Sequence, residues 1–214
     1  LDVLEQRLTA ACGDNGSSGL HALVDLVRRK RSEAQPALFR AHNRLEKRKF
    51  PRRARKLARK SRWRGKRAEP GLGAFARVAL RGGVASVFEP VRDGFADYES
   101  LHGFRIRLKG LRYAMELFAG AFPEDFRRGV YRQVAELQQH LGDVNDHHST
   151  GLRYALWLPG AAGPLAAALE QEIERERQAL QTARERFDAW WTAHGCQLER
   201  GILRYLDGGP NATS

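Results

Sequence analysis

The sequence predicts an all-α protein, and two observations support that prediction. Apolar residues recur every three or four positions along most of the 214 residues, as they do on the buried face of a helix. No stretch shows the strict alternation of apolar and polar residues that marks a β-strand. The chain is long enough for one domain with a sizeable core or for two smaller ones.

The first part of the chain is predicted to hold helices over these ranges: 1–11, 20–45 and 50–62. Gly13 to Gly19 is expected to be a loop, and Pro36 should kink or divide the second helix. Residues 65–73, which contain Pro70, are the best linker candidate. We therefore expect two parts, residues 1–73 and 74–214, each helical.

The second part is predicted to hold five helices, over these ranges: 74–100, 101–118, 130–141, about 146–158 and 164–194. Gly142 should close the third of these helices, and Asn145 or Asp146 should cap the next. Pro159-Gly160 should end the fourth.

Residues 101–118 separate two chemistries when drawn as a helix. One arc of roughly 80° carries polar residues: His102, Arg105, Lys109, Arg112 and Glu116. An arc of roughly 100° on the other side carries apolar residues: Leu101, Phe104, Leu108, Leu111, Met115 and Phe118. Cations about 5 Å apart along a helix axis suit a linear polyanion.

A basic stripe of this kind is often only a solvated face. Ordinary solvated faces mix charges of both signs, however, and Glu116 is the only acid from residue 100 to 123. Like charges at these spacings repel one another unless a ligand compensates, which favours a binding role.

Two motifs in this region resemble the CHAD family, the conserved histidine α-helical domain. They are His102-x2-Arg105-x3-Lys109-x2-Arg112-Tyr113-x2-Glu116 and Leu137-Gln138-x2-Leu141-Gly142-x2-Asn145-Asp146. The resemblance implies helical bundles in two pseudo-repeated halves around a basic central cavity that binds inorganic polyphosphate. It also implies that the first half's own basic helix would precede Leu1, so that this half is truncated. From the helical spacing we expect His102, Arg105, Lys109, Arg112 and Tyr113 to line the anion site, with Gln138 and Asn145 as neutral donors. A lone histidine is often structural, hydrogen-bonded at the start of a helix, but resemblance to the family's signature histidine favours a ligand role for His102.

A second basic element precedes these motifs. Residues 28–67 hold 19 Lys and Arg against two acids, although the net charge of the whole chain is +12. This concentration implies a polyanionic partner. We expect Arg44, Lys47 and Arg48 to join the site, because they adjoin an apolar stripe and can face a cavity between helices.

We therefore expect a non-enzymatic protein that binds polyphosphate without a cofactor or metal. The absence of a long apolar run argues against a membrane partner, and we expect a cytoplasmic protein associated with polyphosphate granules. One alternative is nucleic-acid binding through residues 40–67, where aromatic residues for base stacking are few. Another is an accessory domain of a phosphoanhydride hydrolase. His147-His148 does not complete a metal site, and the alternating glutamates at 172–176 lie in a helical pattern.

Overall fold

The computed structural model describes residues 1–13, 17–60, 62 and 71–208, and these contain helices and no strand. The all-α prediction is confirmed for this part of the chain. The middle of the expected 13–19 loop and most of the expected 65–73 linker lie outside the described residues. The pseudo-repeat and the basic central cavity remain predictions.

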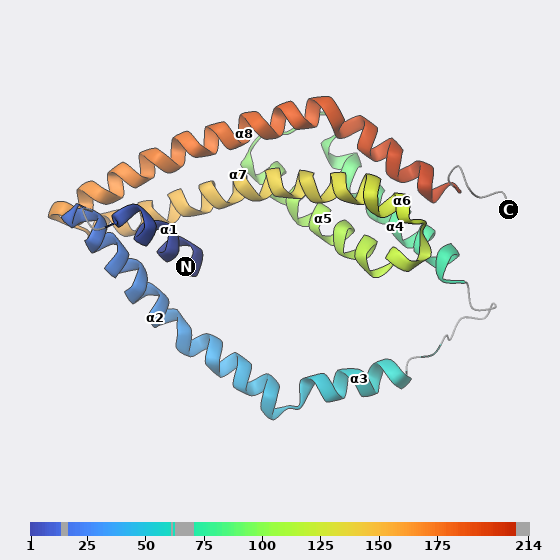
Figure 1. The fold of residues 1–214 in the computed structure, drawn as a ribbon, viewed down its shortest axis with the longest axis horizontal. Helices are drawn as coiled ribbons and strands as arrows, with labels where there is room; N and C mark the ends of the chain where they lie inside the picture. Colours follow the sequence, from blue (N-terminus) through green and yellow to red (C-terminus); the bar gives the residue numbers. More distant parts are fainter. Residues whose placement is uncertain (14–16, 61, 63–70, 209–214) are drawn as a thin grey trace. The chain divides into compact units, whose positions relative to one another are not determined.

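The chain forms two compact units, which are described separately (Figure 1). The first comprises residues 1–69 and 152–174, and the second comprises residues 70–151 and 175–214. The units thus differ from two consecutive segments, because residues 152–174 pack with the first unit. These units are defined by packing, whereas the predicted half-domains are defined by internal similarity. The units therefore do not test the predicted division into residues 1–73 and 74–214, which stays a prediction.

In the first unit, α1 (Asp2–Cys12) packs on the beginning of α2 (Ser18–Lys47). The buried core residues of this unit are Leu4, Leu8, Cys12, Leu23, Val24, Leu26, Val27, Tyr154 and Leu169. Gly19 lies against the backbone of α8 (Gly163–Leu206), where any Cβ would clash with the carbonyl oxygen of Pro164. Glycine at this position therefore allows the two helices to approach closely.

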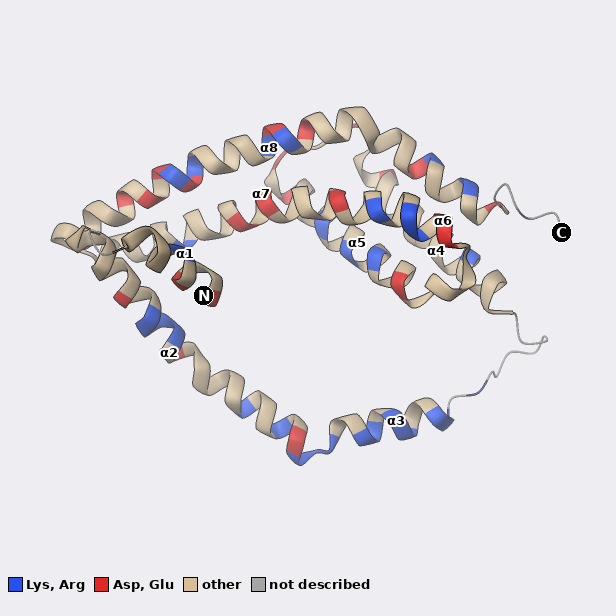
Figure 2. Cartoon of the chain, in the orientation of Figure 1, with Lys and Arg blue, Asp and Glu red and all other residues tan. Residues whose placement is uncertain are grey.

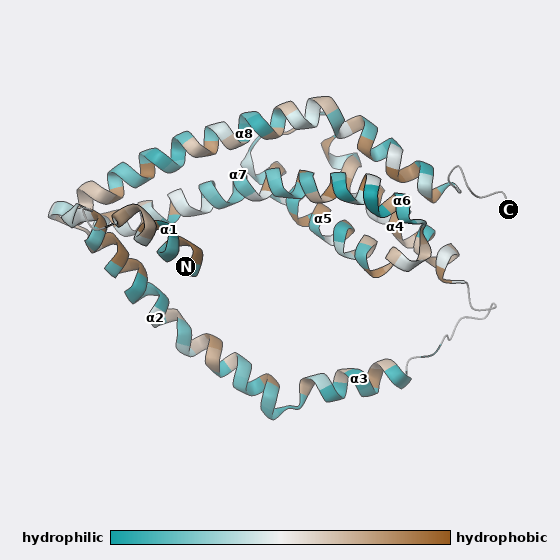
Figure 3. Ribbon diagram, in the orientation of Figure 1, coloured by the Kyte–Doolittle hydropathy of each residue, from teal (hydrophilic) through white to brown (hydrophobic). Residues whose placement is uncertain are grey.

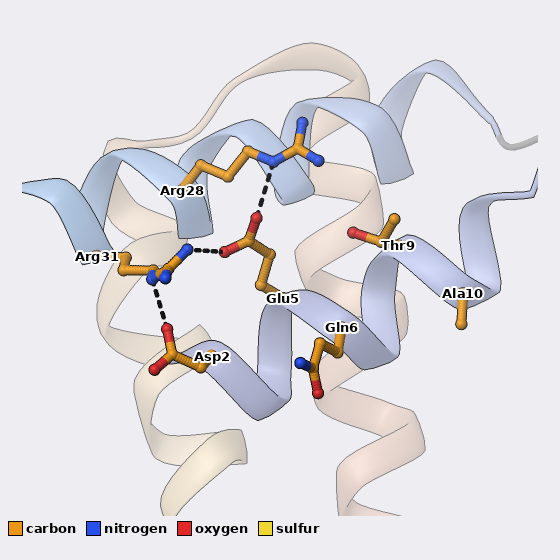
Figure 4. Close-up of a pocket in the computed structure, with 7 residues that line it drawn as sticks. All are labelled: Asp2, Glu5, Gln6, Thr9, Ala10, Arg28 and Arg31. Atoms are coloured by element: carbon orange, nitrogen blue, oxygen red, sulfur yellow. Dashed lines mark hydrogen bonds and ion pairs between the residues drawn. The ribbon is translucent and has the colours of Figure 1, made fainter.

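Ion pairs also hold α1 against α2 (Figure 4). Arg28 Nε donates to Glu5 Oε1 at 3.0 Å, and Arg31 Nη1 donates to Glu5 Oε2 at 3.0 Å. Arg31 pairs with Asp2 as well. The hydrogen bond from Arg28, together with Arg31, lowers the pKa of Glu5 against the opposing effect of burial.

The second half of α2 and the whole of α3 (Phe50–Lys60) are more exposed than the apolar pattern indicates. Every residue from 32 to 60 is exposed, including Leu38 at 69% and Leu45 at 49%. The apolar stripe that Arg44, Lys47 and Arg48 adjoin is therefore uncovered in the described structure. Pro36 does not divide α2, because a proline removes only one backbone hydrogen bond and the helix continues on either side of it.

The second unit is an up-and-down bundle of α4 (Leu72–Phe88), α5 (Tyr98–Leu117), α7 (Arg132–Trp157) and α8. Successive helices run antiparallel, because residue numbers rise along one helix as those of their partners fall along the next. The pairs between α4 and α5 are Phe75–Phe118 and Phe88–Phe104, and those between α5 and α7 are His102–Asn145 and Arg112–Gln138. Between α7 and α8 the pairs are His140–Trp190 and His147–Glu176. Where α4 is visible in Figure 3, hydrophobic residues can be seen along it. Each helix contributes fully buried residues to the core, among them Leu80, Val84, Phe104, Leu108, Leu137, Leu141, Phe187 and Ile202.

Several helix ends differ from the predicted ones. Helix α4 ends at Phe88, before a short 3-10 turn over Glu89–Val91. Helix α7 runs unbroken through Gly142, so neither a stop there nor a cap at Asn145 or Asp146 exists. Helix α8 extends to Leu206 rather than to His194. Short turns occupy the space between α5 and α7: a 3-10 turn at Ala119–Ala121, α6 at Glu124–Phe126 and a π-helical turn at Arg127–Tyr131.

A further 3-10 turn over Leu158–Gly160 separates α7 from α8. Within the described residues, no helix is both long enough and apolar enough to cross a lipid bilayer.

Candidate functional site

Asp97 determines where α5 begins. Ser100 N donates to Asp97 Oδ1 at 2.8 Å, and Asp97 N donates to Ser100 Oγ at 3.2 Å. These reciprocal bonds form a capping box, which satisfies two backbone donors at the start of the helix. The cap sets the start of the helix at Tyr98 rather than Leu101, so Tyr98 and His102 lie one turn apart on the same face.

The two faces of α5 are as predicted. Its buried residues are Leu101, Phe104, Leu108, Leu111 and Met115, and Phe118 is the partly buried residue that ends the helix. The polar row consists of His102, Arg105, Lys109 and Arg112, with Tyr113 beside it; Lys109 and Tyr113 are exposed and the other three are partly exposed. Figure 2 shows the basic residues along α5.

Arg105 and Lys109 are the unpaired cations of this row. Neither makes an ion pair with a carboxylate in the described part of the chain. Arg105 Nε is covered and has no hydrogen-bond partner. Lys109 Nζ lies 5.7 Å from the ring centre of Tyr113. Their charges are therefore available to a ligand without the loss of an internal ion pair.

Arg112 is held firmly by its neighbours. Its Nε donates to Gln138 Oε1 at 2.5 Å, and its Nη1 donates to Glu116 Oε1 at 2.6 Å and to Tyr131 OH at 3.2 Å. Tyr131 OH donates in turn to Glu116 Oε1 at 2.5 Å. The guanidinium also lies 5.0 Å from the ring centre of Tyr113. This network fixes the orientation of Arg112 and offsets part of its charge.

Electrostatics favour the charged form of Arg112. Burial alone would lower the pKa of Arg112, but the hydrogen bond to Tyr131 and the charge of Glu116 raise it overall. Burial, followed by the hydrogen bond to Glu116, raises the pKa of Tyr131. The phenol therefore stays neutral and remains a donor to Glu116.

The opposite end of the row is organised around Asn145 of α7. Its Oδ1 lies 3.1 Å from His102 Nδ1 and accepts from Tyr98 OH at 3.2 Å, while its Nδ2 donates to Asp146 Oδ1 at 3.2 Å. The rings of Tyr98 and His148 are stacked, with their centres 3.4 Å apart. The network thus links His102 on α5 to a second histidine on α7.

His148 is disposed to be neutral in the free protein. Burial lowers the pKa of His148, and the nearby His102 lowers it further, against the opposing charge of Glu99. A polyanion bound at this end of the row would raise the pKa of His148.

His147 and His148 contact different neighbours, as adjacent residues on a helix should. His147 Nδ1 lies 2.7 Å from Oε2 of Glu176, a buried residue of α8, whereas His148 contacts α5. The glutamates at 172–176 do lie in a helix. The residues that the structure describes include no group of three or more His, Cys, Asp or Glu arranged to hold a metal ion.

The three basic residues expected to complete the site belong to the first unit. Arg44 and Lys47 lie in the last turn of α2, and Arg48 follows it. All three are exposed in the described structure, and their part in the site stays a prediction. The structure therefore brings together the five predicted residues of α5 and places these three in the other unit.

Tyr98, Tyr131 and His148 were not predicted as part of the site. Recognition of the Asp97 cap would have placed Tyr98 one turn before His102. No local pattern marks Tyr131, whose role depends on packing of the π-helical turn against α5. Gln138 and Asn145 were expected as neutral donors to an anion; their carbonyl oxygens contact Arg112 and His102, and the donor role of their amide nitrogens stays a prediction.

Comparison with protein families identifies the chain. The CHAD domain family matches residues 1–155, which is most of the chain, so this protein belongs to the CHAD domain family. The matched region includes both motifs and the whole of α5. Searches of curated proteins and of solved structures gave no significant match.

Proposed function

We propose that this chain binds inorganic polyphosphate along the α5 row, without turnover. The observation that carries the proposal is the pair of unpaired cations, Arg105 and Lys109, between an anchored arginine and an anchored histidine. The CHAD family is linked to polyphosphate binding, and the chemistry of the row suits that ligand.

The row suits a linear polyanion better than a compact one. Its members lie three or four residues apart, which places successive groups about 5 Å apart along the helix axis. Arg112 can offer Nη2 to phosphate oxygens, because its Nε and Nη1 already donate to neighbouring side chains, whereas Lys109 acts as a point charge. Because Gln138 and Glu116 already orient Arg112, less side-chain entropy is lost when a ligand binds there.

A double substitution, Arg105→Ala with Lys109→Ala, tests the proposal. Charge-assisted contacts contribute about 1.5 to 3 kcal/mol each, so we expect polyphosphate affinity to fall by roughly a hundredfold or more. Calorimetric titration with long-chain polyphosphate measures this change. The apolar face of α5 is untouched, so the circular dichroism spectrum and melting temperature should be retained.

The matched control is Arg29→Ala with Arg186→Ala. It removes two exposed cations that are outside the α5 row, and so lowers net charge equally. We expect this control to lose little affinity. Equal losses in the two folded variants would mean that net charge, rather than the α5 row, determines binding.

The exposed residues Arg44, Lys47 and Arg48 are proposed to contribute a second, weaker surface. Their substitution by alanine should lower affinity less than the change in α5.

Binding without turnover predicts no release of phosphate from polyphosphate in the presence of Mg²⁺. In a cell, such binding would recruit the protein to polyphosphate granules, which colocalisation of wild type and the α5 variant would test.

A further inference from the structure

A groove in the second unit is lined largely by arginine and lies outside the α5 row. It runs between the first turn of α7, with the π-helical turn before it, and the last turns of α8. The polar side chains that line it are Arg128, Arg132, Gln133, Glu136, Arg204 and Tyr205. We call this feature the arginine groove.

Two backbone features shape the arginine groove. The π-helical turn over Arg127–Tyr131 widens the chain just before α7, and such turns recur at functional sites. At Gly201 a Cβ would lie only 3.1 Å from Val130 Cγ1, so glycine allows α8 to approach this turn closely. Gly129 also lines the groove, and a Cβ there would meet nothing within 4 Å, so this wall is open.

The charges in the groove are incompletely balanced. Arg128 Nη2 pairs with Glu124 at 2.6 Å. Within the described structure, Arg132 and Arg204 have no carboxylate partner, and both are exposed. Glu136 is one turn from Arg132 without forming an ion pair to it.

We propose that the arginine groove is a second anion site, which takes a phosphoanhydride group. The group would come from a short free anion such as tripolyphosphate or from a stretch of a longer chain. This site is separate from the α5 row, and its occupation does not depend on the function proposed for that row.

A phosphoanhydride fits better than a single carboxylate because three guanidinium groups line one groove. Each guanidinium can form paired hydrogen bonds with phosphate oxygens, and several adjacent negative charges are needed to satisfy more than one of them. Gln133 and Tyr205 add neutral donors, which can bond the same oxygens without further charge.

The test is calorimetric titration of the whole chain with tripolyphosphate at about 0.15 M salt, where weak surface attraction is largely screened. We expect Arg132→Ala with Arg204→Ala to lower affinity about tenfold or more. The control Arg29→Ala with Arg186→Ala should leave tripolyphosphate binding nearly unchanged.

Glu136→Gln provides a test of opposite sign. It removes the one carboxylate lining the groove, so affinity for tripolyphosphate should rise by roughly three- to fivefold. Misfolding cannot explain a gain in affinity. Hydrogen exchange should show protection by tripolyphosphate at residues 128–136 and 201–205.

The outcomes separate this proposal from the one for α5. Wild-type affinity in the folded Arg132/Arg204 variant, for both tripolyphosphate and long polyphosphate, would overturn the groove proposal and leave the α5 proposal intact. Loss of only long-chain binding in that variant would support the groove as a subsite for a chain segment. Loss of only tripolyphosphate binding would support it as a site for short anions.

Discussion

Asn145 determines which nitrogen of His102 is available to a ligand. A carbonyl oxygen only accepts hydrogen bonds, so His102 Nδ1 must donate to Asn145 Oδ1. In the neutral ring, Nε2 then carries a lone pair and is a poor partner for a phosphate oxygen. Protonation turns Nε2 into a donor, and we therefore expect phosphate binding to favour the charged ring.

The residue-scale prediction is proton uptake on polyphosphate binding. A bound polyanion stabilises the imidazolium, so polyphosphate affinity should rise as the pH falls. His102→Gln should flatten most of this dependence, whereas Arg112→Ala should lower affinity and keep the slope. Calorimetry in buffers of different ionisation enthalpy measures the proton count directly.

His148 supplies the control for that experiment. Because burial lowers its pKa, the free protein keeps it neutral, and a polyanion near Tyr98 would raise that pKa. His148→Gln should therefore remove a smaller part of the uptake than His102→Gln does. If His102→Gln keeps the full uptake, His102 does not contact the ligand.

Individual contacts were the least predictable part of the site. Helical spacing alone identified the row on α5, because the period of 3.6 residues places its members on one face. The i, i+4 spacing of Arg112 and Glu116 is compatible with an ion pair, but spacing could not show that Gln138 also holds Arg112, because that contact depends on how α7 packs against α5. The contact of Tyr131 with Arg112 depends on a π-helical turn that no sequence pattern indicated.

At the scale of elements, helix existence was predictable and helix ends were not. Gly142 was expected to stop a helix, but its cost of about 1 kcal/mol is smaller than the benefit of burying the residues on either side. Leu137, Leu141 and Val144 are all buried, and they maintain α7 across the glycine. Helix α8 similarly continues beyond His194 because Leu198, Ile202 and Leu206 keep one face in the core.

The junction of α1 and α2 gives the element-scale prediction. The pKa of Glu5 is lowered in the folded protein, so its pairing with Arg28 and Arg31 stabilises the fold at neutral pH. That stabilisation is present above the ordinary glutamate pKa of about 4.3 and should be lost as the pH falls through the lowered folded-state pKa. Glu5→Gln should thus lower the melting temperature at pH 7 and approach wild type at the acidic end of that titration, as calorimetry or circular dichroism would show.

Glu33→Gln is the matched control for this junction. Glu33 pairs with Lys30 at 3.0 Å on an exposed surface of α2, and exposed pairs of this kind contribute little to stability. Its substitution should change the melting temperature only slightly at either pH. A melting curve for Glu5→Gln that parallels wild type at every pH would show that the ion pairs do not hold α1 in place.

At the scale of the whole molecule, the two units present their basic residues differently. The first unit carries six Lys and Arg on α3 with no acid, all exposed (Figure 2). In the second unit, hydrogen bonds orient several cations, among them Arg112 and Arg184. An exposed, unpaired array attracts any polyanion, whereas an ordered row distinguishes ligands by the spacing of their charges.

This contrast predicts how the chain distinguishes polyphosphate from duplex DNA. Binding of both should weaken steeply with salt, because each contacted phosphate releases counterions. Substitution of Arg52, Lys56 and Arg59 by glutamine should reduce the salt dependence for both ligands, since it removes general attraction. Arg105→Ala with Lys109→Ala should instead weaken polyphosphate far more than DNA. Competition titrations at about 0.15 M salt provide the comparison. Wild type should prefer polyphosphate there, and equal binding of DNA would favour the nucleic-acid hypothesis for residues 40–67 instead.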